Sequence, residues 1–144
     1  MQSGTTQREG QGGYAGGTGS VFVFGVRLDL LLMEDVLDRI GRAIDSGEPL
    51  TITGPHFSIL LQAYQDPNLR AFLNGCSINH PDGVGTALAV RFLHGIRCVR
   101  LNGTDLYQRI LRQYPLNRYR YFFLGGDETT VRCLRESFSR MGYN

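Results

Sequence analysis

The most informative part of the sequence reads Ser77-Ile78-Asn79-His80-Pro81-Asp82-Gly83-Val84-Gly85-Thr86. It predicts a short strand that passes through a tight turn into an apolar helix. Pro81 has no amide hydrogen for a sheet ladder, and the two glycines allow a sharp bend close to a ligand. Asp82 is therefore expected at the carboxyl end of a strand and beside a helix N-terminus, where open α/β sheets bind anions such as phosphate. The alternative is that Asp82 only caps the helix.

Short apolar segments alternate with amphipathic segments along the rest of the chain. Strands are predicted at 21–26, 50–53 and 119–124, and residues 27–30 either continue the first strand or form a second. Helices are predicted from 33 to an end at Ser46-Gly47, and at 56–73, 84–93, 106–114 and 131–141. Asp66 and Pro67 interrupt the second helix as an N-cap and a first helical residue. This alternation predicts parallel βαβ units, and therefore an α/β fold with a Rossmann-like, open, mostly parallel sheet and helices on both faces.

Composition limits the domain organisation and the chemistry. The 144 residues suffice for one domain. Residues 1–19 carry seven glycines and are expected to form a disordered tail, whereas 20–144 form the core, from which a C-terminal part is expected to be missing.

All 15 basic residues are arginine, which excludes a lysine nucleophile and leaves guanidinium groups to bind phosphate. The net charge of +2 gives no indication of nucleic-acid binding. The three cysteines predict neither a disulfide framework nor a zinc site, and no transmembrane helix or secretion signal is expected.

Polar loops follow the predicted strands. In an open sheet, the loops 53–56, 80–85 and 125–130 would meet at one edge, and a fourth polar cluster spans 100–105. Thr104 and Asp105 are expected to cap the helix that follows them. These loops predict a ligand that contains a phosphate or a nucleotide, but no particular reaction. For His56 and His80, which flank the site, a structural role and a functional role both remain open.

Four features in this order resemble the bacterial WecG/TagA/CpsF family of glycosyltransferases, also called glycosyltransferase family 26. They are Gly25-Val26-Arg27-Leu28-Asp29 followed by Met33-Glu34-Asp35-Val36-Leu37, then Gln65-Asp66-Pro67-Asn68-Leu69-Arg70 with Leu73-Asn74, then Pro81-Asp82-Gly83-Val84-Gly85, and finally Arg100-Leu101-Asn102-Gly103-Thr104-Asp105-Leu106. The segment Phe122-Phe123-Leu124-Gly125-Gly126 also fits. The similarity extends over residues 21 to 143.

The resemblance implies transfer of a hexosyl group, such as N-acetylmannosamine, from a UDP-sugar to a polyprenyl-diphosphate-linked acceptor in the synthesis of cell-surface polysaccharide. It places the enzyme at the cytoplasmic face of the plasma membrane, in peripheral contact through a C-terminal segment beyond residue 144. It implies Asp82 as catalytic base and Arg100 beside the diphosphate, with no metal or other cofactor. A nucleic-acid partner is not expected, and a homo-oligomer is left open. The expected substrate-binding residues are Thr53, His56, Gly83, Gly85, Asn102, Gly103, Thr104, Asp105, Gly125 and Gly126.

The sequence also departs from the family pattern. The family's T-x-N motif falls on Gly54 and His56, with Thr53 one place earlier, so the identity of the sugar is left open. The family's later P-K-Q-E motif would lie beyond residue 144. A non-catalytic nucleotide-binding or regulatory module derived from this fold is therefore the main alternative. An NAD(P)-linked Rossmann enzyme ranks last, because Gly25-Val26-Arg27 is not a glycine-rich first turn.

Overall fold

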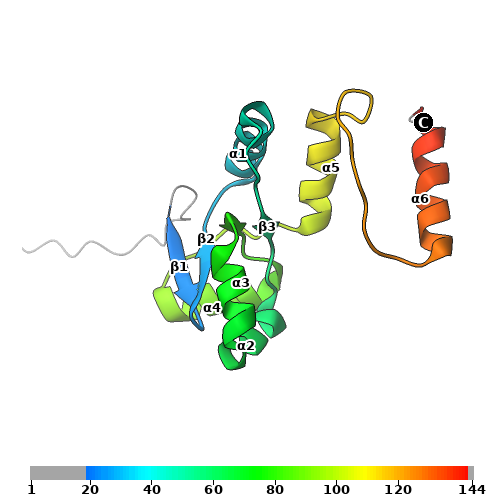
Figure 1. Cartoon of the computed structure of the whole chain (residues 1–144). Helices are drawn as coiled ribbons and strands as arrows, with labels where there is room; N and C mark the ends of the chain where they lie inside the picture. The colour runs from blue at the N-terminus through cyan, green and yellow to red at the C-terminus, as the bar shows by residue number, and fades with distance from the viewer. Residues whose placement is uncertain (1–18, 143–144) are drawn as a thin grey trace, which may run out of the picture. The chain divides into compact units, whose positions relative to one another are not determined.

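The computed structural model describes residues 19–142 (Figure 1). The chain divides into two compact units, up to Leu106 and from Tyr107 onward, which are described separately. Residues 1–18 of the predicted tail lie outside the described residues. The single core expected over 20–144 stays a prediction. The first unit contains β1 (Ser20–Val23), β2 (Val26–Asp29), α1 (Met33–Ser46), β3 (Ile52–Thr53), α2 (Phe57–Gln65), α3 (Pro67–Gly75), β4 (Ile78–Asn79), α4 (Gly83–His94) and the first residues of α5 (Gly103–Gln113).

An antiparallel hairpin of β1 and β2 opens the first unit. Its two turn residues, Phe24 and Gly25, both have positive φ angles, of 52° and 81°, as tight two-residue hairpins require. The Phe24 ring lies 5.9 Å from the rings of Phe57 and Tyr64, and these contacts hold a backbone conformation that is uncommon outside glycine. The prediction of one continuous strand over 21–26 is therefore wrong, and a second short strand follows the turn.

The parallel pair β3 and β4 forms a second, separate sheet, in which Ile52 lies opposite Ile78 and Thr53 opposite Asn79. A mixed α/β fold is confirmed, but a Rossmann-like open sheet is not, because the strands form two two-stranded sheets. The break between the sheets has a physical cause. The amide of Asn79 donates to the side chain of Asp29, at 2.8 Å, rather than to the backbone of β2.

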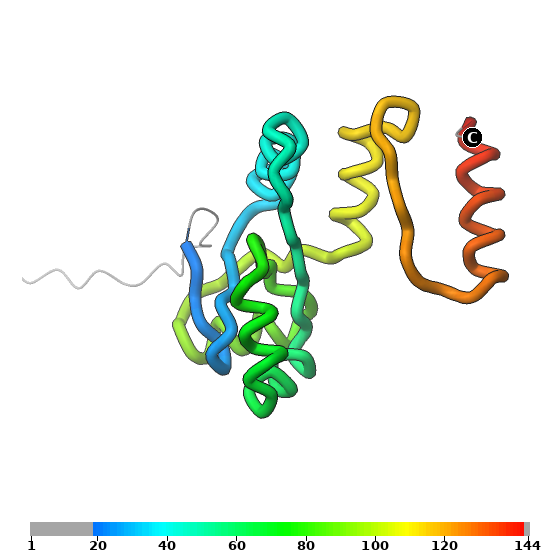
Figure 2. Tube along the Cα trace, in the orientation of Figure 1, coloured from blue at the N-terminus to red at the C-terminus, as the bar shows by residue number. Residues whose placement is uncertain are grey.

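The core of the first unit lies between the hairpin and three helices. Helices α2 and α3 pack against β2, and α4 packs against β1. In the Cα trace of Figure 2, the green segment of α3 runs beside the blue segment of β2. Local signals set the helix ends: Gly47 ends α1 with a left-handed φ of 71°, and the Asp66 carboxylate accepts from the first amides of α3. The buried core residues are Val23, Val26, Leu28, Leu30, Leu60, Ala63, Leu73 and Val90.

The second unit consists of the rest of α5, an irregular segment and α6 (Glu128–Arg140). The strand predicted at 119–124 is wrong, because no residue of this segment is in a strand. Aromatic contacts hold the segment in place of a ladder: Phe123 stacks on Tyr121 at 6.1 Å and on Phe138 of α6 at 5.5 Å. Phe123, one of the aromatic residues that favoured a strand in the sequence, thus packs against a helix instead.

Candidate functional site

The loops that follow β3 and β4 lie side by side. The His80 amide donates to the Thr53 carbonyl at 2.9 Å, so the two strands end together. The hydroxyl of Thr86, in the first turns of α4, donates to the Pro55 carbonyl at 3.2 Å. The first unit therefore brings together the predicted loops 53–56 and 80–85, as parallel strands that end at one edge require.

Gly83 and Gly85 allow the two loops to approach closely. Gly83 has a φ of 77°, which strains any residue with a side chain. A Cβ atom at Gly85 would lie 2.9 Å from the Cβ atom of Phe57, so the start of α4 is in contact with the start of α2. Both glycines are explained by backbone shape, and their contact with a substrate stays a prediction.

Asp82 occupies the N-cap position of α4, but its side chain makes no capping hydrogen bond. Its side chain is half-buried. A capping aspartate uses its carboxylate to accept from the first amides of the helix. The structure therefore gives no support to the interpretation that Asp82 serves only as a cap, and the carboxylate remains available to a ligand.

The segment that carries Arg100 lies beside the Asp82 loop. The buried residue Leu101 donates its amide to the Pro81 carbonyl at 3.3 Å, which joins the neighbours of Arg100 and Asp82. The Arg100 side chain is exposed. Within residues 19–142 the two charged groups form no ion pair with each other.

The next residues begin α5. Asn102 is its cap, because its Oδ1 accepts from the Thr104 amide at 2.9 Å and its carbonyl accepts from Leu106 at 3.0 Å. The prediction that Thr104 and Asp105 cap this helix is therefore wrong. The helix begins at Gly103, earlier than its apolar periodicity indicated, and Asp105 lies exposed in the first turn. These residues follow directly on Arg100 and remain candidates for substrate contact.

Thr53 and His56 lie at opposite ends of the first loop. The Thr53 hydroxyl donates to Oδ1 of Asn79, so a ligand can use only the lone pairs of this hydroxyl. His56 is exposed at the N-cap of α2, and its Nδ1 lies 2.8 Å from the Ser58 hydroxyl. Contact of either side chain with a substrate stays a prediction.

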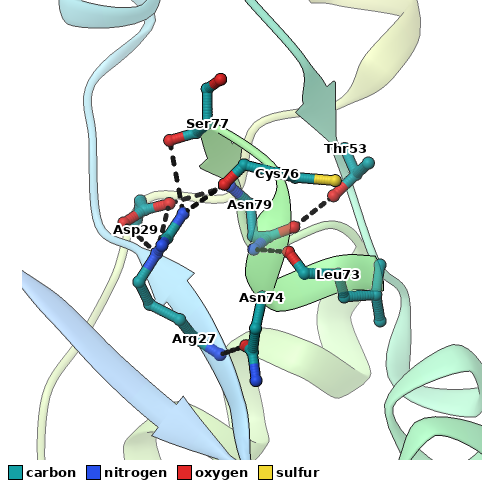
Figure 3. Close-up of polar contacts among 8 residues, drawn as sticks. All are labelled: Arg27, Asp29, Thr53, Leu73, Asn74, Cys76, Ser77 and Asn79. Atoms are coloured by element: carbon teal, nitrogen blue, oxygen red, sulfur yellow. Dashed lines mark hydrogen bonds and ion pairs between the residues drawn. The ribbon is translucent and has the colours of Figure 1, made fainter. Parts of the chain in front are cut away.

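A polar network joins β2, β4 and the end of α3, and is drawn in Figure 3. Arg27 Nε donates to Asp29 at 3.1 Å, and its Nη2 donates to the Cys76 carbonyl at 2.6 Å. Asp29 in turn accepts from the Asn79 amide, and the buried Asn79 side chain donates to the Leu73 carbonyl at 2.8 Å. These residues were not predicted to belong to the site. Arg27 and Asp29 are two residues apart and therefore share one face of a strand. This spacing was the available signal that the two charged groups lie together.

His80 is the residue of the site whose burial the sequence did not indicate. Its side chain is 3% exposed, and its Nδ1 is buried with no hydrogen-bond partner in the described chain. Burial lowers the pKa of His80 below its ordinary value of 6.5, while the nearby Asp82 carboxylate and the backbone of Pro81 and Leu101 offset part of that effect. The imidazole is therefore neutral near pH 7.

Gly125 and Gly126 belong to the second unit, so no position relative to the loops above is assigned to them. They have φ angles of 125° and 79° and lead into Asp127, the N-cap of α6. A Cβ atom at Gly126 would lie 3.0 Å from the Thr130 side chain. Backbone shape explains this pair of glycines, and contact with a nucleotide stays a prediction.

A comparison with protein families matches residues 21–142 to the Glycosyl transferase WecG/TagA/CpsF family. The chain belongs to this family. The match spans all four sequence features, from the hairpin to the segment of Arg100, and continues through α6. No curated protein matches the chain. Membership of the WecG/TagA/CpsF family supports a transferase and implies a sugar donor and an acceptor in general.

Two further observations concern this family member. No group of three or more metal-binding side chains occurs within residues 19–142, and no helix there is long and apolar enough to cross a membrane. One open cavity of about 660 Å³ lies at the C-terminal end of α1, and another of about 920 Å³ lies within the second unit. Neither is lined by Asp82 or Arg100.

Proposed function

We propose that this member of the WecG/TagA/CpsF family transfers a hexosyl group from a UDP-sugar to a polyprenyl-diphosphate-linked acceptor at the cytoplasmic face of the plasma membrane. The observation that carries the proposal is that the Asp82 carboxylate makes no capping hydrogen bond at the N-terminus of α4. Asp82 also lies in a loop that is hydrogen-bonded to the segment of Arg100. A carboxylate that is not used for capping is free to accept a proton from a substrate.

In the proposed reaction, Asp82 takes the proton of the acceptor hydroxyl. The hydroxyl oxygen forms a bond to the anomeric carbon of the sugar, and the bond from that carbon to the diphosphate oxygen breaks. UDP leaves with the bonding electrons. Arg100 stabilises the negative charge that develops on the diphosphate, since a guanidinium group can donate two parallel hydrogen bonds to phosphate oxygens.

The remaining substrate contacts are assigned to loop residues. The first turn of α4 presents amides at Gly83 and Gly85, and a helix N-terminus favours an anion. His56 and the exposed residues at the start of α5 are proposed to contact the sugar or the nucleotide; the latter are Asn102, Gly103, Thr104 and Asp105. We assign the same role to Thr53, Gly125 and Gly126.

The test is a transfer assay with the purified chain, a panel of UDP-sugars and a polyprenyl-diphosphate acceptor analogue. We expect Asp82→Asn to lower turnover by about 10²–10⁴-fold, because asparagine cannot take the proton. Arg100→Ala should lower turnover by about 10²-fold or more. Arg97→Ala is the matched control, since it removes an exposed arginine from the same segment. Unchanged turnover in Asp82→Asn would show that the base is wrongly assigned.

Calorimetry with UDP separates the enzyme from the non-catalytic alternative. An enzyme binds UDP and transfers sugar from at least one donor. A regulatory module would bind UDP and transfer none, and this result would contradict the proposed reaction while leaving the family assignment intact.

A further inference from the structure

His80 lies where the two strand-end loops meet. Its amide is bonded to the end of β3, and its imidazole lies against Gly54 in the loop that follows. A Cβ atom on Gly54 would lie 2.7 Å from Nε2 of the ring and closer still to Cε1, nearer than real Cβ contacts allow. Residue 54 must therefore be glycine for the imidazole to occupy this position.

The imidazole also adjoins the segment of Arg100. Burial lowers the pKa of the ring, and the backbone of Pro81 and of Leu101 offsets part of that effect. These same two residues share the hydrogen bond of 3.3 Å between the two segments. The negative charge of Asp82, two residues after His80, also raises the pKa of the ring and so offsets a further part of the effect of burial. One buried side chain thus adjoins three segments that carry candidate site residues.

Stability alone does not explain a histidine at this position. Nδ1 is buried without a partner, and an unpaired buried polar atom destabilises a fold. A leucine of similar volume would fill the space without that cost. Unsatisfied buried groups in native structures call for another explanation, and a role at a functional site is one of the recognised kinds.

We propose that His80 is a positioning residue for glycosyl transfer: its imidazole, packed in the space that Gly54 leaves, fixes the Asp82 turn against the segment of Arg100. The inference rests on the proposed function, because Asp82 and Arg100 are the groups that it positions. His80 acts through these loops and makes no contact with the substrate.

The first test is a double-mutant cycle on the transfer reaction, with Gly54→Ala, His80→Ala and the double variant. Each single variant should lower kcat by about tenfold or more, because small displacements of reacting groups are costly. The double variant should be no slower than His80→Ala, since the new methyl group then has no ring to displace. Gly75→Ala is the control, because a Cβ atom there meets nothing within 4 Å. Losses that multiply in the double variant would overturn the proposal.

The second test separates positioning from packing. His80→Leu keeps the volume but offers no polar edge to the backbone of Pro81 and Leu101. We expect its melting temperature to be unchanged or higher while kcat falls and the KM for the donor changes little. A residue with a purely structural role would leave kcat unchanged in a variant that melts normally, and this result would contradict the proposal.

The third test needs no activity. Amide hydrogen exchange of Leu101 in the full chain should be faster in His80→Ala and in Gly54→Ala, and unchanged in Gly75→Ala. Unchanged exchange in both of the first two variants would overturn the positioning role, even if no sugar is transferred. If exchange rises as expected but no donor supports transfer, the proposed function fails and the link between the loops stands.

Discussion

Asp82 and Asp127 occupy the same position at the start of two helices, but only Asp127 acts as a cap. The Asp127 carboxylate accepts from the Thr130 amide at 2.7 Å, whereas the Asp82 carboxylate makes no such bond to α4. The two aspartates have similar extended backbone angles, with φ of −88° and −107°. The difference therefore lies in the side chain, and it separates a structural aspartate from one that is available for chemistry.

Alanine at each position should distinguish these roles. Asp127→Ala removes a capping bond, so α6 should lose amide protection in hydrogen exchange. Asp82→Ala removes no capping bond, so the free energy of unfolding should change by no more than about 0.5 kcal/mol. Denaturant unfolding measures the second effect. A large loss of stability in Asp82→Ala would show that this carboxylate has a structural role after all.

The cap of α6 should also depend on pH. Hydrogen bonds to Thr130 lower the pKa of Asp127 from its ordinary value of 3.8. A carboxyl group whose pKa is lowered in the folded state contributes its full stability above 3.8, and the contribution is lost as the pH falls through the lowered pKa. The amide chemical shift of Thr130, followed by NMR between pH 6 and about pH 2, reports this change. Asp127→Asn keeps the cap without titrating, so its Thr130 amide should stay constant.

Protonation of His80 should also lower the stability of the fold in acid, because burial disfavours the charged imidazole. Because its pKa in the folded state lies below 6.5, the unfolded chain binds the proton first as the pH falls. The free energy of unfolding should therefore be highest above pH 6.5, fall below that value, and level off once the folded-state pKa is passed. Urea unfolding at a series of pH values measures the decline.

Two variants test the origin of this decline. His80→Leu should remove the part of the decline in unfolding free energy that begins just below pH 6.5. His56→Gln should retain it, because this variant leaves the buried imidazole of His80 in place. An identical pH dependence in wild type and His80→Leu would assign the effect to other groups.

The link between the two sheets should be important for stability. Asp29→Ala leaves the Asn79 amide and the Arg27 guanidinium without their shared partner, in a region where Asp29 is only 15% exposed. We expect a loss of about 1–3 kcal/mol in the free energy of unfolding. Asp38→Ala, at an exposed position of α1, is the control and should stay within about 0.5 kcal/mol of wild type. Equal effects of the two changes would contradict a structural role for the network.

Features that depend on neighbouring residues were predictable from the sequence. The boundary between α2 and α3 follows from Asp66, whose carboxylate bonds the amides of Asn68 and Leu69. The end of α1 follows from the backbone freedom of Gly47. The approach of the loops after β3 and β4 follows from parallel pairing alone.

Features that depend on distant residues were not predictable. The hairpin turn contains Phe24, which lacks the usual preference for positive φ and is held by rings of α2. The segment 119–124 has strand-forming residues but no ladder partner among the described residues. His80 gave no signal of burial, because the space it fills exists only through the missing side chain of Gly54.

The bond between Asp29 and Asn79 also bears on self-association. Ile78 and His80 direct their amides to β3, so the Asn79 amide points from the opposite edge of β4. An unpaired amide on a strand edge is a template on which another molecule can add a strand. The Asp29 carboxylate occupies that amide and places a negative charge beside it. We therefore expect a chain without this carboxylate to precipitate more readily at high concentration.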